Sequence, residues 1–230
     1  MATPATCPQA KDLSAHLTSK HLPPTPTFLT TILSTARPST PLPALQRTAL
    51  FRLLASDITS TVAYTPASML PANIHDAGIK ERRLAGPIPV QVLDIEDIGH
   101  SRWSQVEALE AAERGEMTKG REVIRVVADR ENDAAPEESA SSGPHKLLLQ
   151  DAAGAKVYGV ELMGVEGIGL GMNIGAKMVL REVVVARGVV LLEPRSVTVL
   201  GGKIEGLHKQ WRDGRKERLK AAVGMAERRA

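Results

Sequence analysis

Apolar positions in the first part of the chain recur at helical spacing, and prolines separate them into three groups. A short first group ends at the proline-rich "HLPPTP". The second group begins with Thr25 as the expected N-cap and Pro26 at the first helical position, where proline is favoured. The same arrangement returns at Thr40 and Pro41. Because three short amphipathic helices cannot bury their apolar faces singly, residues 1–64 are expected to form a helical bundle.

The pattern changes from a helical period to a strand period after Gly86. "IPVQVLDIEDI" alternates from Ile88 to Val92 and then shifts phase to Leu93 and Ile95, which predicts a β-bulge. The pairs "HKLLLQD"/"KVYGVELM" and "KMVLREVVVA"/"VVLLEP" are joined by "AAGA" and "RG", which are typical of hairpin turns. A last run, "SVTVL", follows Pro194, which is expected to kink or end the preceding strand. About five strands without long helices between them favour a small antiparallel Greek-key barrel.

These patterns divide the chain into four parts. We expect an N-terminal helical bundle over residues 1–64, a linker over 65–86, a β-barrel over 87–210 and a basic C-terminal helix or tail over 211–230. A long insertion, residues 99–144, separates the first barrel strand from the second. Insertions of this length within a compact domain are usually functional or disordered.

The insertion combines a predicted helix with a segment that is too polar to bury. Ser104 and Glu107 are expected to form a capping box for a helix that ends at Gly115, and "REVIRVV" is a possible extra strand. "DRENDAAPEESASSGP" is acidic and serine-rich, as disordered segments are. Apolar side chains on a long loop need a partner to cover them, so they are candidate partner-binding residues. They are Trp103, Val106, Leu109, Val123, Ile124 and Val126.

Charge and composition limit the classes of partner. The formal net charge is +3, but residues 203–230 carry nine Lys/Arg against four Asp/Glu. This tail is either the solvated face of a helix or a weak contact for DNA. Aromatic residues make up 3% of the chain, which argues against a surface that stacks single-stranded bases.

Other motifs exclude several kinds of chemistry. With Cys7 as its one cysteine the chain cannot form an internal disulfide, and it has no apolar run near the roughly 18 residues of a membrane span. No secretion signal is apparent, so a cytosolic or nuclear location is expected. We find no nucleophile, histidine or metal-binding motif, and we interpret "DIEDIGH" as a solvated strand end. The chain is therefore not expected to be an enzyme, to bind a metal or cofactor, or to take a small-molecule substrate.

The glycine-rich "GVEGIGLGMNIGAK" raises the question of nucleotide binding. A phosphate loop of nucleoside triphosphatases needs a G-K-[ST] sequence, but Ala176 separates Gly175 from Lys177, and Met178 takes the place of the hydroxyl. A dinucleotide-binding loop is followed by a helix, whereas a β-branched run follows here. The run is therefore interpreted as a connection that turns at Gly175 into the next strand.

Three segments together resemble a known family. "MLPANIHDAGIKERRLAGPIPVQVLDIEDIGHSRWSQ", "HKLLLQDAAGAKVYGVELM" and "IGAKMVLREVVVARGVVLLEPRSVTVLGGKIEGL" are similar to the RecQ-mediated genome instability protein 1 family, in its short form with one OB-fold. The resemblance implies an N-terminal three-helix domain followed by a five-stranded OB-fold barrel with a long insertion after its first strand. The insertion resembles the family's only at "RWSQ".

The resemblance also implies a function. Members are nuclear, non-catalytic subunits of a complex of a RecQ-family helicase with topoisomerase III, a type IA enzyme. That complex promotes double Holliday junction dissolution and decatenation in DNA recombination and repair. The OB-fold binds the topoisomerase, and the insertion influences the opening of its gate. The alternatives are a single-stranded-DNA-binding OB-fold protein of replication or repair, a telomere- or replication-type scaffold and, last, a nucleotide-dependent enzyme.

Overall fold

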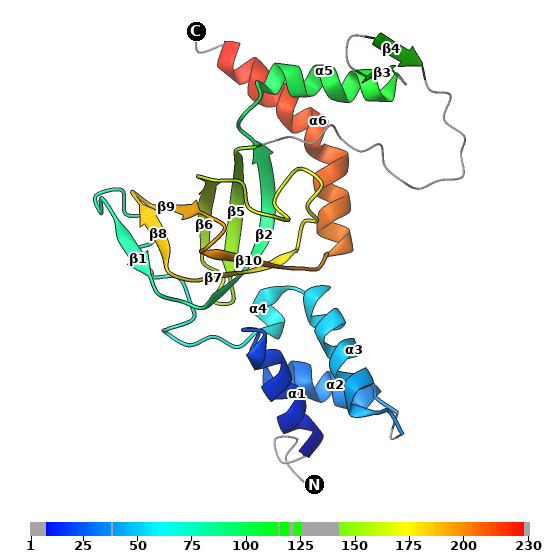
Figure 1. Cartoon of the computed structure of the whole chain (residues 1–230), viewed down its shortest axis with the longest axis vertical. Coiled ribbons are helices and arrows are strands. Elements are labelled where there is room, and N and C mark those ends of the chain that lie inside the picture. Colours follow the sequence, from blue (N-terminus) through cyan, green and yellow to red (C-terminus); the bar gives the residue numbers. More distant parts are fainter. Residues whose placement is uncertain (1–7, 38, 115, 120–121, 126–142, 228–230) are drawn as a thin grey trace.

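The computed structural model describes residues 8–37, 39–114, 116–119, 122–125 and 143–227 (Figure 1). Four helices form the start of the chain, and a curled sheet follows. The helices are α1 (Pro8–Ser19), α2 (Pro26–Thr35), α3 (Leu42–Leu54), α4 (Ile58–Thr61), α5 (Arg102–Glu113) and α6 (Glu205–Glu227). Helix α5 lies at the far end of the sheet from the first four, and α6 runs along the side of the sheet until it meets α5. The strands are β1 (Arg82–Leu84), β2 (Ile88–Asp97), β3 (Glu116–Lys119), β4 (Glu122–Arg125), β5 (His145–Asp151), β6 (Lys156–Glu161), β7 (Lys177–Leu180), β8 (Val183–Ala186), β9 (Val189–Leu192) and β10 (Val197–Gly201).

The helical start is confirmed, although one of its two predicted caps is wrong. Thr25 caps α2 as expected, since its hydroxyl accepts a hydrogen bond from the amide of Phe28 at 3.3 Å. Thr40 does not cap α3: Pro41 itself occupies the N-cap position in an extended conformation and Leu42 begins the helix. The Thr40 side chain is therefore one residue too far from the first turn. The core of this part contains Leu13, Leu17, Leu22, Phe28, Ile32, Leu45, Ala49, Leu53, Ile58 and Val62.

The expectation of five strands is wrong, because the main sheet of the described residues has eight. Its order is β1-β8-β9-β6-β5-β2-β7-β10, with β6 and β9 parallel and the other neighbours antiparallel. One expected strand is interrupted between β7 and β8, where Glu182 adopts a φ of 46°. The strand end expected at Pro194 is confirmed, because β9 ends at Leu192 and β10 begins at Val197. β1 adds a further strand by pairing with β8.

The pairing makes the sheet curl upon itself. The chain runs from β7 directly into β8 and from β9 into β10. β7 pairs with β10 at one end of the strand order, and β8 pairs with β9 near the other end. The predicted bulge in β2 is confirmed, because the register with β5 shifts between Val92 and Asp94. Trp211 of α6 is buried against the sheet core, and its indole N–H donates to the Asp94 carboxylate at 2.6 Å. α6 is thereby fixed to the bulged part of β2.

The glycine-rich run forms the connection between β6 and β7, and Lys177 at its end is fully buried. The Lys177 ammonium donates to the carbonyl oxygens of Leu54 (3.1 Å), Ser56 (2.6 Å) and Gly175 (2.7 Å). Gly175 has a φ of 90°, and a Cβ there would lie 2.6 Å from the backbone nitrogen of Ile204. The lysine thus joins the helical start to the sheet instead of facing an anion.

The range expected as a linker, 65–86, contains two ordered features. Leu70 and Ile74 belong to the core of the sheet, and the Leu70 amide donates to the buried carboxylate of Asp151 at 2.7 Å. β1 also lies in this range. Within the described residues, no helix is long and apolar enough to cross a bilayer.

Candidate partner interface

The insertion leaves the sheet through a closed neck at the end of β2. The amide of Ile98 donates to the carbonyl oxygen of Pro144 at 3.0 Å, so the outgoing and returning chains touch. A Cβ on Gly99 would lie 2.5 Å from the carbonyl oxygen of Gly143, which leaves no room for a side chain there. The two ends of the insertion are therefore held together at this end of the sheet.

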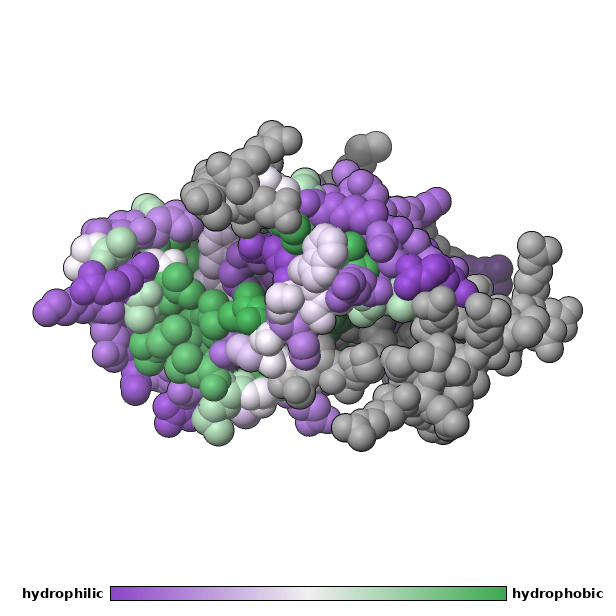
Figure 2. Space-filling model, turned by 90° about the horizontal axis from the view of Figure 1, so that it is seen from above, coloured by the Kyte–Doolittle hydropathy of each residue, from purple (hydrophilic) through white to green (hydrophobic). Residues whose placement is uncertain are grey.

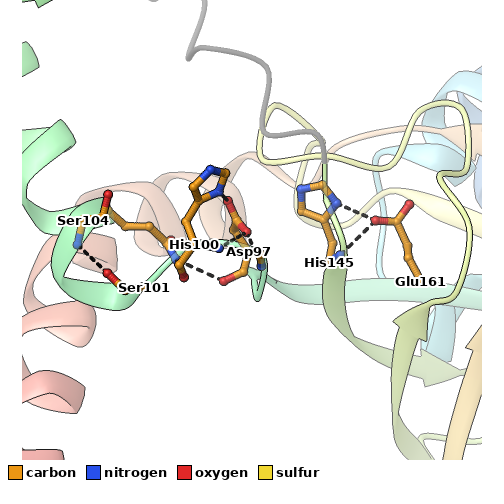
Figure 3. Close-up of polar contacts among 8 residues, drawn as sticks. Asp97, His100, Ser101, Ser104, His145 and Glu161 are labelled. Atoms are coloured by element: carbon orange, nitrogen blue, oxygen red, sulfur yellow. Dashed lines mark hydrogen bonds and ion pairs between the residues drawn. The ribbon is translucent and has the colours of Figure 1, made fainter.

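A buried carboxylate organises the outgoing side of the neck. Asp97 accepts hydrogen bonds from the amides of Gly99 (2.7 Å) and His100 (3.1 Å), and its second oxygen lies 2.8 Å from Nδ1 of His100 (Figure 3). The side-chain amide of Gln105 donates back to the carbonyl oxygens of Asp97 and His100, at 3.0 and 3.1 Å. These bonds set the direction in which α5 leaves the sheet.

α5 begins earlier than the sequence pattern suggested, so the predicted capping box is wrong. Ser101 is the N-cap, and its hydroxyl accepts from the amide of Ser104 at 3.1 Å (Figure 3). Ser104 lies inside the first turn, since the helix begins at Arg102, and it cannot cap the same helix. The expected helix end at Gly115 lies outside the described residues.

The returning side of the neck is held by a buried histidine–glutamate pair. Nδ1 of His145 lies 2.5 Å from the carboxylate of Glu161, which also accepts the amides of His145 and Val165, both at 3.0 Å (Figure 3). The two side chains are 2% and 3% exposed, so no substrate can reach them. The part of the chain that the structure describes holds no group of three or more side chains suited to a metal ion. The pair therefore ties β5 to the end of β6.

Ion pairs hold α5 against α6. Lys220 lies 2.8 Å from Glu110, and Lys216 lies 2.5 Å from Glu113. The hydrogen bond from Lys220 lowers the pKa of Glu110, and the same bond raises the pKa of Lys220. Two lysines of the basic C-terminal helix are thus engaged by the insertion helix, which reduces the positive charge that α6 offers to DNA.

The predicted partner-binding residues fall into different environments. Trp103 is 58% exposed near the start of α5, Leu109 is half-buried, and Val106 is buried. Val123 and Ile124 lie on β4, where they pair with Thr118 and Met117 of β3. Val126 lies outside the described residues. Among the members whose side chains the structure describes, Trp103 offers a large apolar surface to solvent. Contact of the set with a partner stays a prediction.

The structure adds an apolar surface that the sequence reasoning missed. Ile98 follows β2 and is 46% exposed, while Leu162 and Met163 follow β6 and are 55% and 62% exposed. β5 lies between β2 and β6 and begins at the same end, so the three residues form what we call the sheet-end patch. Figure 2, seen from that end, shows apolar side chains gathered beside the polar helices. The sequence could have indicated this exposure. Adjacent residues of a strand point to opposite faces, so Leu162 and Met163 cannot both enter the core.

Models of one protein family match both the helical start and the sheet domain of the chain. The family model described as the RMI1 N-terminal OB-fold domain matches residues 70–215, and that of the RMI1 N-terminal helical domain matches residues 17–61. RecQ-mediated genome instability protein 1 of Schizosaccharomyces pombe is 30% identical over 69% of this chain and 72% of its own length.

Vertebrate proteins of the same name are similar over a smaller share of their length. The protein of Mus musculus is 25% identical over 62% of this chain, and that of Xenopus laevis is 31% identical over 60%. The matched regions are 22% and 23% of those two proteins. The chain therefore spans most of the fungal relative and less than a quarter of each vertebrate relative.

Proposed function

The chain belongs to the RecQ-mediated genome instability protein 1 family, and from this premise we propose that it is a nuclear, non-catalytic subunit of a complex of topoisomerase III with a RecQ-family helicase. Its relatives' names support a genome-stability role linked to RecQ. We further propose that the OB-fold domain binds the topoisomerase and that the insertion promotes strand passage. The complex would thereby dissolve double Holliday junctions and decatenate DNA.

The sheet-end patch beside the fixed neck is the observation that carries this proposal. Ile98, Leu162 and Met163 expose large apolar side chains next to the root of the insertion, and Trp103 lies just beyond it. Fully burying one such side chain contributes about 1.5–3 kcal/mol. A partner that covers several of them gains an anchor of the kind that dominates protein interfaces.

The neck determines how a partner bound to this surface meets the insertion. Because Asp97 and Glu161 fix the two sides of the insertion to β2 and β6, a partner docked on the patch meets the insertion in one orientation. Pre-organisation of this kind lowers the entropy cost of binding. We infer that the patch supplies affinity and that the insertion, held beside it, acts on the bound topoisomerase.

A binding measurement tests the docking surface. We expect Leu162→Asp combined with Met163→Asp to weaken the affinity for purified topoisomerase III at least tenfold in isothermal titration calorimetry, because two carboxylates would have to be desolvated. Tyr64→Ser is the matched control, since Tyr64 is similarly exposed (54%) but lies next to the helical start. Equal affinity of the patch variant and the control would show that the topoisomerase docks elsewhere.

Single-stranded DNA binding is the second candidate, and one observation favours it. Tyr158 on β6 is 49% exposed, and the Lys146 ammonium lies 4.9 Å from the centre of its ring. An exposed aromatic ring beside a cation is the kind of site on which OB-folds stack bases. Salt-dependent affinity for an oligothymidylate that falls in Tyr158→Ala would support this candidate. Affinity unchanged by that substitution would remove it.

A further inference from the structure

Two adjoining hollows lie between α2 and α3, on the helical start of the chain. The first has a volume of about 370 Å³ and the second of about 220 Å³. Ile32 and Arg52 line both, so the hollows adjoin, and together they form what we call the α2–α3 trough. α1 packs against both helices, and Figure 1 places all three at the opposite end of the molecule from α5.

The trough has an apolar floor and one prominent apolar residue on its rim. Phe28 and Ile32 form the floor and are buried, at 9% and 2% exposure. Phe51 of α3 lines the first hollow and is 73% exposed, the highest value among the large apolar side chains that the structure exposes within its described residues. An exposed phenylalanine beside an apolar hollow is typical of a protein-docking surface.

The trough offers positive charge, and two of the threonine hydroxyls that line it are bonded within α2. The hydroxyls of Thr31 and Thr35 donate to carbonyl oxygens of α2 itself. Arg37 and Arg52 are the charged residues among those lining the hollows, and none of the lining residues is acidic. Arg52 donates to Thr35 at 2.7 Å and so lies across the trough from α3 to α2. Apolar contact and positive charge are therefore what this surface offers.

We propose that the α2–α3 trough binds an amphipathic helix of a partner protein, with apolar side chains on one face and carboxylates beside them. The apolar side chains pack against Phe28, Ile32 and Phe51, and the carboxylates pair with Arg37 and Arg52. A helix in a groove between two helices buries its apolar face while its own backbone stays hydrogen-bonded. Nucleic acid fits less well, because its phosphates do not use an apolar floor.

This surface is separate from the sheet-end patch. The two lie at opposite ends of the molecule, so a partner on the trough does not compete with a partner on the patch (Figures 1 and 2). The chain can thus hold two proteins at once, one by an extended apolar patch and one by a groove with positive charge.

The experiment uses two synthetic peptides with one apolar face in common. Each forms a helix of roughly five turns with leucines at i, i+3, i+4 and i+7, and the flanking positions are glutamate in one and lysine in the other. Fluorescence anisotropy of the labelled peptides measures their affinity for the full chain. We expect the glutamate peptide to bind at least tenfold more tightly than the lysine peptide.

A pair of neighbouring substitutions locates the binding site. Thr31 lines the first hollow and Thr30 does not, yet both are exposed and both donate to a carbonyl four residues earlier at 2.9 Å. Thr31→Trp should fill the hollow and weaken the glutamate peptide at least tenfold, while Thr30→Trp should leave its affinity unchanged. Combining Arg37→Glu with Arg52→Glu should reverse the preference between the two peptides.

Several outcomes would overturn the proposal. Equal affinity for the two peptides would exclude charge recognition, and equal effects of Thr30→Trp and Thr31→Trp would exclude the trough as the site. Thermal melting of each variant shows whether it is folded, and the arginine reversal, which exchanges surface charges, serves where a tryptophan variant fails to fold. The affinity of the same variants for the topoisomerase should equal that of the parent. Peptide binding therefore tests this proposal, and topoisomerase binding tests the proposed function separately.

Discussion

Replacing Lys177 with methionine removes the buried cation that joins the helical start to the sheet. Its side chain is fully buried and donates to three carbonyl oxygens, two of which, those of Leu54 and Ser56, belong to the helical start. Methionine has a similar volume but no donor. Lys177→Met therefore leaves the three acceptors without this partner while relieving the cost of a buried charge.

The size of the effect follows from these two opposing contributions. Burial lowers the pKa of Lys177 from 10.5 to about 8, although the charge of Asp57 opposes the shift. This corresponds to about 3 kcal/mol of unfavourable free energy for the charged form. Three hydrogen bonds from a charged donor contribute about 1.5–3 kcal/mol each. Since the hydrogen bonds outweigh the burial cost, we expect Lys177→Met to reduce the free energy of unfolding by about 3 kcal/mol at pH 7.

The same residue predicts a dependence on pH. The folded pKa lies below the unfolded one, so between about pH 8 and pH 10.5 the unfolded chain binds more protons. The contribution of Lys177 to stability is therefore smallest below pH 8 and rises as the pH increases through this range. The difference in stability between the parent and Lys177→Met should accordingly be larger at pH 10 than at pH 7.

Urea unfolding followed by far-UV circular dichroism, at pH 7 and pH 10, measures both effects. Lys156→Met is the matched control, because Lys156 is exposed on β6 and its replacement should change stability by less than about 0.5 kcal/mol. If Lys177→Met and Lys156→Met unfold at the same urea concentration, the buried lysine does not stabilise the junction and this reasoning is wrong.

Three further substitutions test other parts of the structure by the same unfolding measurement. Asp97→Ala should cost about 1–3 kcal/mol, because it leaves the amides of Gly99 and His100 without their acceptor, whereas the exposed Asp213→Ala should cost little. Gly175→Ala should cost about 2 kcal/mol or more, since its φ is 90° and a Cβ would meet Ile204 at 2.6 Å, but Gly169→Ala, with open space around it, should be tolerated. Val197→Asp should abolish cooperative folding because Val197 is buried, whereas Thr198→Asp on the exposed side of β10 should not, and similar stability of these two variants would contradict the strand assignment.

Local sequence patterns predicted the elements whose cause is local. Thr25 with Pro26 marked the start of α2, the phase shift at Val92 and Leu93 marked the bulge, and "AAGA" and "RG" marked two hairpins. In each case the signal lies within a few residues of its effect. The break between β7 and β8 was missed, because Glu182 adopts a positive φ that no local preference of glutamate indicates.

Features set by tertiary contacts could not be predicted from the sequence. Lys177 was considered as a phosphate ligand and rejected on spacing, but its burial depends on carbonyls more than 120 residues away in the chain. Trp103 and Val106 looked alike as apolar residues of a loop, yet α5 exposes the first and buries the second. The exposure of Phe51 likewise depends on how α2 and α3 are placed by α1.

The most direct test of the central claim is the rate of decatenation by purified topoisomerase III, measured with the parent chain and with a variant whose residues 99–144 are replaced by a short Gly/Ser turn. The neck should tolerate this replacement, because β2 and β5 pair on either side of it. We expect the parent to bind the topoisomerase and to stimulate decatenation, and the variant to bind with similar affinity but to stimulate it far less. A parent chain that neither binds nor stimulates the topoisomerase would contradict the account, and full stimulation by the variant would show that the insertion is only a spacer.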